Sequence, residues 1–443
     1  MTPAARLQAA IELLEAVAET PRPADGTASA YFRDRRYIGS KDRRAISNRV
    51  WGMLRRWART AWWLRRAWMG PAPSWEYMPP RARLVADLVL HDGMGEDAIE
   101  ALFNDEDHAP QALGGLERHM IKRLKGQSLE DPEMPTWVRH EVPEWVIARL
   151  TPLYGDHLGD VLTALNAEGP VDLRVNTLKT DLERAVAELA AEEVVAMPTR
   201  FSPLGLRLEG RPNLAITKAF RDGLVEVQDE GSQLVALLAD ARPGQAVVDF
   251  CAGAGGKTLA MSAAMQGKGR LVACDVSEGR LDRSAVRLKR AGAHNVSRRV
   301  LSGERDKWVK RSVGSYDRVL IDAPCSGTGT WRRNPDAKWR LSEESIADLI
   351  ELQANILRSA ARLAKPGGRV IYATCSLLPE ENEHQVEAFV SQTDDFRILP
   401  IPTVWAEVFG DSVPCPTEGA TLRLDPARHG TDGFFVAVLE RVV

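Results

Sequence analysis

The chain has 443 residues, which exceeds one ordinary domain and, at roughly 100 to 200 residues per domain, predicts about two to four of them. Its hydrophobic fraction of 44%, its charged fraction of 27% and its formal net charge of −3 exclude a disordered or fibrous chain. Sizeable apolar cores are therefore expected.

Processing and redox features favour the cytoplasm. The first residues, MTPAARLQAAIELLEAVAET, lack the apolar core of a signal peptide, and no uncharged apolar run reaches the roughly 18 residues that a membrane helix needs. The five cysteines form no CxxC pair and no Cys/His cluster at metal-ligand spacing, which argues against a disulfide framework and a structural zinc. We expect a cytoplasmic monomer with reduced thiols, no metal and no membrane partner.

The first part of the chain is predicted to be all-helical. Residues 5–20 have the spacing of an amphipathic helix, and helical patterning continues to about Leu124. Residues 33–66 hold twelve basic and two acidic side chains, a concentration that favours contact with nucleic acid. The same arginines also suit the solvated face of a helix above a buried stripe, whose members are Ile46, Val50, Leu54, Trp57, Ala61 and Leu64.

Two further regions follow. The polar, proline-bearing stretch 125–135 is predicted to be a linker. The next hundred residues mix helical signals with short alternating stretches such as VDLRVNTLK, which predicts a small α+β domain. After residue 243, short apolar strands alternate with longer helical segments, as in a parallel sheet with crossover helices. The predicted domains are 1–130, 136–235 and 236–443.

The strands of the last domain locate the candidate chemistry. Five are predicted, at residues 246–250, 270–275, 296–301, 316–322 and 368–375. In open α/β sheets, ligands bind at the carboxyl ends of strands where the strand order reverses. The candidates are therefore the residues that follow these strands, namely Cys251 to Thr258, Asp275, Asp322 to Gly327 and Thr374 to Ser376.

The first predicted strand runs into DFCAGAGGKT, residues 249–258, whose glycines let backbone amides approach a ligand. A dinucleotide fingerprint needs Gly or Ala where Thr258 stands, and a phosphate-binding P-loop needs Gly where Cys251 stands. Asp249 disfavours a triphosphate and favours a cationic amine. The loop thus predicts S-adenosyl-L-methionine, which carries an ammonium beside a carboxylate. Asp275 suits the ribose hydroxyls or, alternatively, a cap of the following helix.

Two cysteines, Cys325 and Cys375, each follow a predicted strand. If these strands are neighbours, both thiols face one cleft. A single free cysteine is most often an inert small hydrophobe, but two at equivalent strand ends beside a cofactor loop favour catalysis. A nucleophilic thiol gains from nearby positive charge, such as Lys257 or a bound sulfonium.

Three long motifs carry a resemblance to a known family. DFCAGAGGKT, DAPCSGTGTWRRNPDAKWR (322–340) and ATCSLLPEENEHQVE (373–387) resemble, in order and spacing, the motifs of the Sun family of RNA cytosine-C5 methyltransferases. The resemblance covers about residues 136–443. It implies that the last domain is an α/β, Rossmann-like class I methyltransferase domain.

Shorter segments extend the resemblance. LRVN (173–176) and VQDEGS (227–232) match in the middle domain, and DGFF (432–435) matches near the end. GSKDRRAISNRVWGMLRR (39–56) is similar to the NusB-like RNA-binding domain of the bacterial members that act on 16S ribosomal RNA. The fold class implied is thus an all-α NusB-like N-terminal domain, a small α+β middle domain that contributes to RNA binding, and the methyltransferase domain.

The resemblance implies methyl transfer from S-adenosyl-L-methionine to cytosine C5 through a cysteine adduct at C6. It implies that Cys375 is the nucleophile and that Cys325 assists release of the RNA; spacing alone does not rank the two thiols. Asp322 is expected at N3 of the cytosine or else closing its own loop, with Lys257 nearby. The family's cofactor contacts carry over to Cys251, Ala252, Gly253, Ala254, Gly255, Gly256, Lys257, Asp275, Arg280, Asp322 and Pro324.

The implied partner is RNA, either 16S rRNA or an assembling small ribosomal subunit. The aspartate that contacts adenine in the family falls where Ser302 and Gly303 stand, so Glu304 or Asp306 is the candidate replacement. The candidate RNA contacts, some of which alternatively are surface residues or helix caps, are Arg174, Asn176, Arg332, Arg333, Lys338, Arg43, Arg44, Arg55 and Arg56.

Two other functions stay open on the sequence. A P-loop-like nucleotidase would place Gly256, Lys257 and Thr258 on phosphates and Asp322 on magnesium, but it leaves the cysteine pair unexplained. A non-enzymatic RNA-binding ribosome assembly factor with a degenerate methyltransferase domain would explain the missing aspartate. The intact glycine loop and both cysteines oppose that second alternative.

Overall fold

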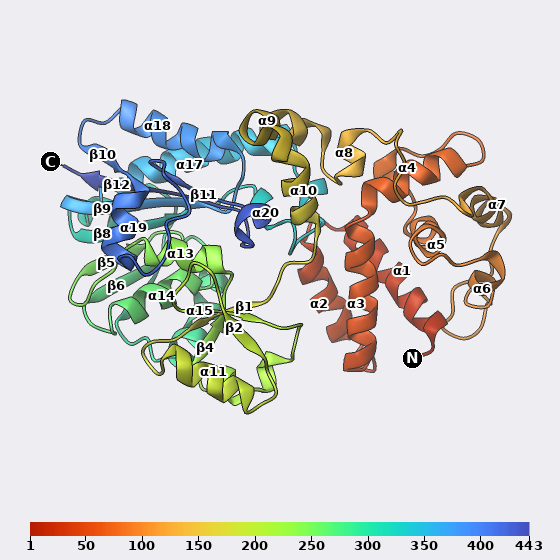
Figure 1. Ribbon diagram of the computed structural model, residues 1–443, viewed down its shortest axis with the longest axis horizontal. Helices are drawn as coiled ribbons and strands as arrows, with labels where there is room; N and C mark the ends of the chain where they lie inside the picture. The colour runs from red at the N-terminus through yellow and green to blue at the C-terminus, as the bar shows by residue number, and fades with distance from the viewer. Residues whose placement is uncertain (443) are drawn as a thin grey trace. The chain divides into compact units, whose positions relative to one another are not determined.

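The structure is a computed structural model that describes residues 1–442. The chain forms two compact units, whose elements Figure 1 labels. The helical unit comprises Met1–Ala167 and Trp331–Leu341, and the sheet unit comprises Glu168–Thr330 and Ser342–Val443. This division differs from the predicted domains 1–130, 136–235 and 236–443, because residues 136–167 and 331–341 pack with the first helices.

The helical unit surrounds one buried helix. Every residue of α5 (Pro80–Leu90) from Ala82 to Leu90 is buried, and α5 shares one apolar cluster with seven other helices. These helices are α1 (Pro3–Glu19), α2 (Ala24–Asp34), α3 (Ser40–Leu54), α4 (Trp57–Ala67), α6 (Glu96–Glu100), α7 (Gly115–Leu124) and α8 (Thr136–Arg139). The unit also contains α9 (Glu144–Tyr154) and α10 (Leu158–Asn166).

The predicted apolar stripe is buried except for Trp57, which is half-buried, and it lies on two helices rather than one. The helix that carries Ile46, Val50 and Leu54 ends at that leucine, and a new helix begins at Trp57. Both carboxylate oxygens of the fully buried Asp87 accept from Arg56, and one of them also accepts from Arg49. Part of the arginine-rich segment therefore neutralises a buried acid inside the unit.

A buried glutamate joins the later helices to this unit. Glu141 follows α8, and its carboxylate accepts from the backbone nitrogens of Ala58 and Arg59 at 2.8 and 3.0 Å, where α4 has unpaired amides. It also accepts from the Arg59 guanidinium at 3.0 Å. This capping explains why residues 136–167 fold with the first helices.

The segment 331–341 is held in the helical unit by polar contacts along its length. The Asp336 carboxylate accepts from the backbone nitrogen of Ala24 at 3.0 Å. Lys338 donates to Asn166 at 2.7 Å, and Arg340 donates to the carbonyl of Thr20. The loop that follows Cys325 therefore ends in a different unit from the one in which it starts.

The sheet unit begins with a small antiparallel sheet in the order β2-β3-β1-β4. Its core packs α11 and α12 against the apolar face of the strands, with Leu173, Val175 and Leu206 buried. The elements are β1 (Asp172–Val175), α11 (Leu182–Ala190), β2 (Ala196–Pro198), β3 (Gly205–Leu208), α12 (Lys218–Arg221) and β4 (Val225–Val227).

The main sheet has the order β10-β12-β9-β8-β5-β6-β7, with β11 paired to β12. The segment from β7 to β9 is parallel, and β12 is antiparallel both to β9 and to β10, so that β10 runs in the same direction as the parallel strands. The strands are β5 (Ala246–Asp249), β6 (Arg270–Asp275), β7 (Val296–Val300), β8 (Tyr316–Asp322), β9 (Ala364–Thr374), β10 (Phe396–Leu399), β11 (Leu422–Leu424) and β12 (Phe434–Arg441).

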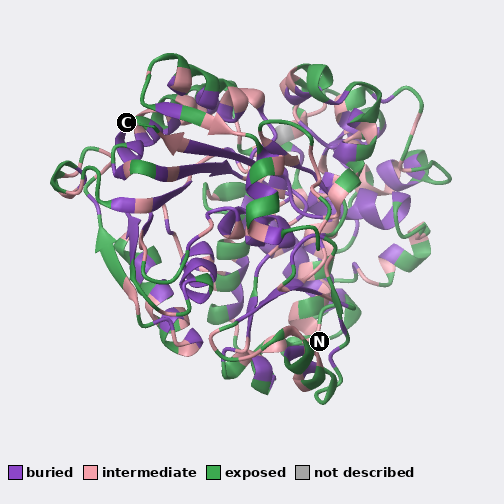
Figure 2. Ribbon diagram, turned by 60° about the vertical axis from the view of Figure 1, so that its left-hand side comes forward, coloured by how far each residue is buried: buried purple, intermediate pink, exposed green. Residues whose placement is uncertain are grey.

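Helices cover both faces of this sheet (Figure 1), so alternate residues of each central strand enter two different cores. Ile321 and Tyr372 pack on the side of α17 (Glu343–Ala361) and α18 (Glu383–Ser391). Leu320 and Ile371 pack on the side of α13, α14 and α19. Figure 2 shows the resulting continuous burial along the central strands. The remaining helices are α13 (Glu230–Leu237), α14 (Gly256–Ala264), α15 (Glu278–Ala291), α16 (Lys307–Arg311), α19 (Ile401–Phe409) and α20 (Pro426–His429).

The predicted Rossmann-like sheet is confirmed, and all five predicted strands are present within a few residues. The sequence prediction missed β10 to β12, which extend the sheet beyond β9. Among residues 1–442, no helix combines the length and the apolar character needed to cross a membrane.

Candidate active site

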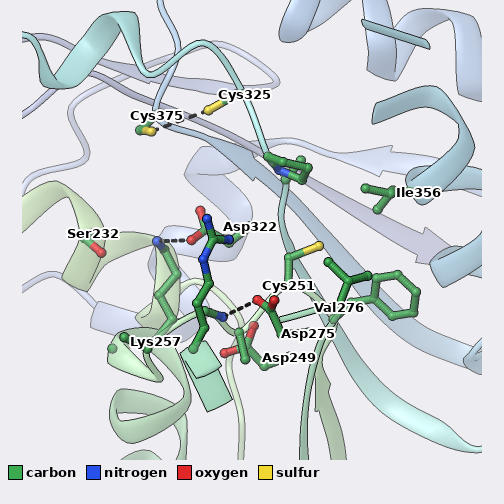
Figure 3. Close-up of a pocket in the computed structure, with 18 of the residues that line it drawn as sticks. Ser232, Asp249, Cys251, Lys257, Asp275, Val276, Asp322, Cys325, Ile356 and Cys375 are labelled. Carbon is green, nitrogen blue, oxygen red and sulfur yellow. Dashed lines mark hydrogen bonds and ion pairs between the residues drawn. The ribbon is translucent and has the colours of Figure 1, made fainter. Parts of the chain in front are cut away.

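A cavity of about 560 Å³ opens at the carboxyl ends of the parallel strands. It lies where β5 pairs with β6 on one side and with β8 on the other, which is the point where the strand order reverses. The glycine loop, Asp249, Asp275, Asp322 and both predicted thiols line this one cavity (Figure 3). The sheet topology thus collects side chains that are far apart in the sequence.

The glycine loop turns tightly into α14. Gly255 has a φ of 81°, and a Cβ atom there would lie 3.0 Å from that of Ser284, so only glycine fits without displacing α15. The backbone nitrogen of Gly253 donates to Asp275 at 2.8 Å. The loop is therefore fixed by backbone conformation and by the acid that ends β6.

Asp249 has a free acceptor for a cation. One carboxylate oxygen accepts from the Thr258 hydroxyl at 2.6 Å, while the other is buried and has no hydrogen-bond partner among the described residues. Burial raises the pKa of Asp249 to about 7. An ammonium group placed at this oxygen would satisfy it and restore the charge, so the site fits the amino group of a methionyl cofactor.

The other predicted cofactor residues lie around the same cavity. Asp275 also accepts from the backbone nitrogen of Ser277 at 2.8 Å, so it fixes the start of α15 as well as the glycine loop. Arg280 is exposed at the edge of the cavity, and Pro324 lies on its wall. Burial raises the pKa of the Cys251 thiol well above its ordinary value, which keeps that thiol protonated.

Lys257 and Asp322 form an ion pair of 2.7 Å, and both residues line the same cavity as the two thiols. Burial acts to lower the pKa of Lys257, but the attraction of Asp322 outweighs it and raises the pKa above its ordinary value. The ammonium also lies 5.3 Å from the ring centroid of Phe434, in the predicted DGFF motif. Lys257 is therefore a fixed cation rather than a proton acceptor.

The two predicted thiols meet. Cys325 follows β8, Cys375 follows β9, and these strands are neighbours in the sheet. Their sulfur atoms are 3.4 Å apart, joined by the upper dashed line in Figure 3. The hydrogen bond with Cys375, and secondly burial, raise the pKa of Cys325 well above its ordinary value. Cys325 therefore retains its proton when one of the pair ionises.

A buried carboxylate that the sequence reasoning missed ties the two cysteine loops together. Glu381 accepts from the backbone nitrogen of Ser326 at 2.8 Å, from Gln353 at 2.9 Å, and from the hydroxyls of Ser326 and Ser376. These two serines directly follow the two cysteines. The signal in the sequence was the acidic pair of ATCSLLPEEN, of which the second glutamate, Glu381, is fully buried.

Glycine permits one further close approach. A Cβ atom on Gly329 would lie 2.3 Å from the carbonyl oxygen of Gly433, and the two backbones exchange a 2.8 Å hydrogen bond from Gly433 to Gly329. Gly329 also donates to the carbonyl of Cys375 at 2.9 Å. The glycines of GTG and DGFF thus let the Cys325 loop lie directly against β12 and the Cys375 loop.

Two of the predicted RNA contacts, Arg174 and Asn176, have side chains that are buried in the sheet unit. Arg174 donates to the carbonyl of Gly256 at 2.9 Å and to Gln228, and burial lowers its pKa to about 10. Asn176 donates to the carbonyls of Gly223 and Ala291 at 2.8 and 2.9 Å. Both residues brace the cofactor loop and α15 and do not reach solvent.

Several basic candidates of the helical unit also point inward. Lys338 is 1% exposed, and burial lowers its pKa to about 7, so it is no phosphate contact. Arg332 is buried, Arg56 pairs with the buried Asp87, and Arg55 donates to the carbonyl of Arg332. Of these candidates Arg44 is exposed, and Arg43, Arg55, Arg56 and Arg333 are half-buried.

Of the two candidate replacements at the predicted adenine end, Glu304 lines the cavity and Asp306 does not. Asp306 caps α16, accepting from the backbone nitrogens of Ser302 and Trp308 at 2.9 and 2.7 Å, and it does not line the cavity. Gly303 and Glu304 do line it. The predicted site also left out several other lining residues, among them Val227, Gln228, Ser232 and Arg287.

The site holds a nucleoside-type cavity with an acid at each of three strand ends, in a doubly covered α/β sheet. Among residues 1–442, no group of three or more His, Cys, Asp or Glu side chains is placed to hold a metal ion. Fold and site together are those of an α/β enzyme that binds a nucleoside cofactor.

Comparisons with known proteins specify the class. A family model described as 16S rRNA methyltransferase RsmB/F matches residues 236–440, and one for the ferredoxin-like domain of RsmF/B-like methyltransferases matches residues 142–215. The chain is 32% identical to a probable ribosomal RNA small subunit methyltransferase B of Synechocystis sp., over 91% of this chain and 92% of that relative.

Solved structures agree. The protein called PH0851 is 27% identical, with a TM-score of 0.80 over 100% of this chain and 99% of that chain. A methyltransferase homologue from Pyrococcus horikoshii is 29% identical, with a TM-score of 0.60 over 70% of this chain and 100% of that chain.

The chain therefore belongs to the RsmB/F family of 16S rRNA methyltransferases, which confirms the resemblance to the Sun family. It is an rRNA methyltransferase that uses S-adenosyl-L-methionine, and its substrate is RNA. This membership removes the nucleotidase as an alternative, and the glycine loop and both cysteines in one cavity oppose the non-enzymatic assembly factor.

Proposed function

We propose that this protein methylates C5 of a cytosine in 16S rRNA through a transient bond between Cys375 and C6 of the base. The observation that carries the proposal is the pair of thiols 3.4 Å apart in the cavity that the glycine loop also lines. Neither thiol is needed to bind a nucleoside cofactor, whereas a cytosine ring needs a nucleophile before C5 can react.

The residues act in a defined order. The Cys375 thiolate adds to C6, which gives C5 the electron density of an enamine. S-adenosyl-L-methionine, when bound, supplies an electrophilic methyl group. After C5 is methylated, the C5 proton leaves and its electron pair re-forms the C5–C6 bond, so that the sulfur of Cys375 departs as a thiolate.

Cys325 and the ion pair have supporting roles. The raised pKa of Cys325, caused by its hydrogen bond with Cys375 and by burial, disfavours Cys325 as the attacking thiolate. We infer that Cys325 assists release of the methylated RNA. Asp322 contacts N3 of the cytosine as that nitrogen gains a proton, and Lys257 holds the Asp322 carboxylate in place at 2.7 Å.

The test is covalent trapping on the full-length protein with 16S rRNA transcripts and S-adenosyl-L-methionine. Cys375→Ala is expected to abolish methyl transfer and to form no adduct. Cys325→Ala is expected to accumulate a protein–RNA adduct that survives denaturing gel electrophoresis. Cys415→Ala provides the matched control, because this half-buried cysteine lies outside the cavity.

The outcomes separate the possible mechanisms. An adduct that accumulates in the Cys375 variant would reverse the two roles. Methyl transfer at normal rates by both single variants would reject the covalent route. Mapping of the methylated nucleotide by bisulfite sequencing tests the position, since 5-methylcytosine resists conversion and a product at another atom of the base would refute C5.

We also propose that the helical unit is a NusB-like RNA-binding domain that helps to capture 16S rRNA or an assembling small subunit. Its support is the turn between α2 and α3, where exposed basic residues flank Tyr37 in the sequence and the surface of Tyr37 is 77% exposed. Stacking on an exposed ring and phosphate contacts by flanking cations suit unpaired RNA. The basic residues of this tip are Arg33, Arg36, Lys41 and Arg44.

A further inference from the structure

One arginine that lines the cavity, Arg287, is not among the predicted site residues. Arg287 lies on α15 and lines the cavity beside Ala254 and Gly256 of the glycine loop. Its guanidinium donates to the carbonyl of Ala254 at 2.9 Å, and its side chain is 27% exposed. It is therefore fixed to the cofactor loop yet open to the cavity.

A buried acid orients this guanidinium. Glu226 of β4 is 2% exposed and accepts from Nε and Nη2 of Arg287 at 3.3 and 3.2 Å. Its other oxygen accepts from Arg290. One carboxylate thus faces two guanidiniums, which leaves this wall with a surplus of positive charge.

The geometry of the guanidinium leaves donors free. Of its five N–H groups, Glu226 and Ala254 take three, so each terminal nitrogen keeps one N–H without a partner among the described residues. A guanidinium that keeps one N–H on each terminal nitrogen has a donor for each oxygen of a carboxylate. Arg287 is thus preorganised for an anion at the loop end of the cavity.

The strand ends carry charge of the opposite sign; the other cations that line the cavity are Arg280 at its edge and Lys257, which is paired with Asp322. Asp249 with its free oxygen and Asp275 lie at the strand ends, and both line the cavity with Arg287. The methionyl end of the cofactor carries an ammonium and a carboxylate on one carbon. Acids at the strand ends and a cation at the α15 wall match those two charges.

We infer that Arg287 receives the carboxylate of the methionyl end of S-adenosyl-L-methionine, and that Glu226 is the residue that positions Arg287. The inference concerns cofactor recognition only, so it holds or fails independently of the cysteine chemistry.

The test is equilibrium binding by calorimetry, without RNA, of the full-length protein to S-adenosyl-L-methionine and to its decarboxylated analogue. The wild type should prefer the intact cofactor by about 10-fold or more, because a hydrogen-bonded charge pair is at stake. Arg287→Leu should weaken binding of the intact cofactor about 10- to 100-fold while changing that of the analogue less than about 3-fold. Arg287→Lys should recover part of the loss.

Two controls isolate the effect. Arg283→Leu removes an exposed arginine from the same helix outside the cavity and should leave both affinities unchanged. Glu226→Gln should reduce the preference for the intact cofactor without abolishing it. Equal losses for both ligands in Arg287→Leu would mean that the arginine only shapes the loop, and equal affinities in the wild type would overturn the inference with no variant needed.

Discussion

Glu381 offers the sharpest test of how the two cysteine loops are held. Replacement by alanine removes the acceptor for four donors: the Ser326 amide, the Gln353 amide and two serine hydroxyls. The hydroxyls can re-pair, because those of Ser326 and Ser376 already lie 3.1 Å apart. Two buried N–H donors stay unsatisfied at about 1 to 3 kcal/mol each, so unfolding of the sheet unit should become easier by about 2 to 6 kcal/mol.

The effect on catalysis follows from position rather than contact. Glu381 does not line the cavity, so cofactor affinity should stay within about threefold. Release of the two loops displaces the thiols, and a shift of about 1 Å can cost about 100-fold in turnover. Glu381→Gln, which keeps one acceptor oxygen, should lose only about 1 to 2 kcal/mol of stability.

Urea unfolding, calorimetric cofactor binding and single-turnover methylation give the three readouts. Glu387→Gln, on the exposed side of α18, is the matched control. If Glu381→Ala unfolds at the wild-type urea concentration and retains full turnover, the reasoning about the shared carboxylate is refuted. Loss of cofactor affinity in parallel with turnover would instead place the defect in the cavity.

Two further predictions concern binding. Because burial raises the pKa of Asp249 to about 7, its charged form is disfavoured in the empty site, so its contribution to stability falls as the pH rises from the unfolded pKa of about 4 through 7. The cofactor ammonium needs the ionised form of Asp249, so the affinity for the cofactor should rise with pH through 7. This pH dependence should vanish in Asp249→Asn. If calorimetric titrations of that variant still show affinity rising with pH, another group is responsible for the dependence. For RNA, replacing Arg33, Arg36 and Arg44 together by glutamine should weaken binding and flatten its salt dependence by about 0.7 to 0.9 of a log unit per lost phosphate contact, whereas Arg123→Gln should do neither. If filter binding shows the same salt dependence of RNA affinity in this variant as in the wild type, these arginines are ordinary solvated surface residues and not phosphate contacts.

Local sequence signals were sufficient wherever the physical constraint is itself local. Strand ends followed by glycine predicted the cofactor loop, since close backbone approach to a ligand needs residues without a Cβ. The equivalent positions of Cys325 and Cys375 predicted a shared cleft, because neighbouring parallel strands end at one edge. Both expectations rest on residues within a few positions of a strand.

Only the tertiary structure determined which partners the charged side chains contact. Arg174 and Lys338 look like phosphate contacts in the sequence, but the first ends at the carbonyl of Gly256 and the second at Asn166. Arg287 and Glu381, which the sequence reasoning passed over, lie in the cavity wall and between the cysteine loops. An arginine or glutamate pairs in the same way with a ligand, a helix end or a buried backbone group. Which partner it finds depends on contacts between segments up to hundreds of residues apart, and only the folded chain determines those.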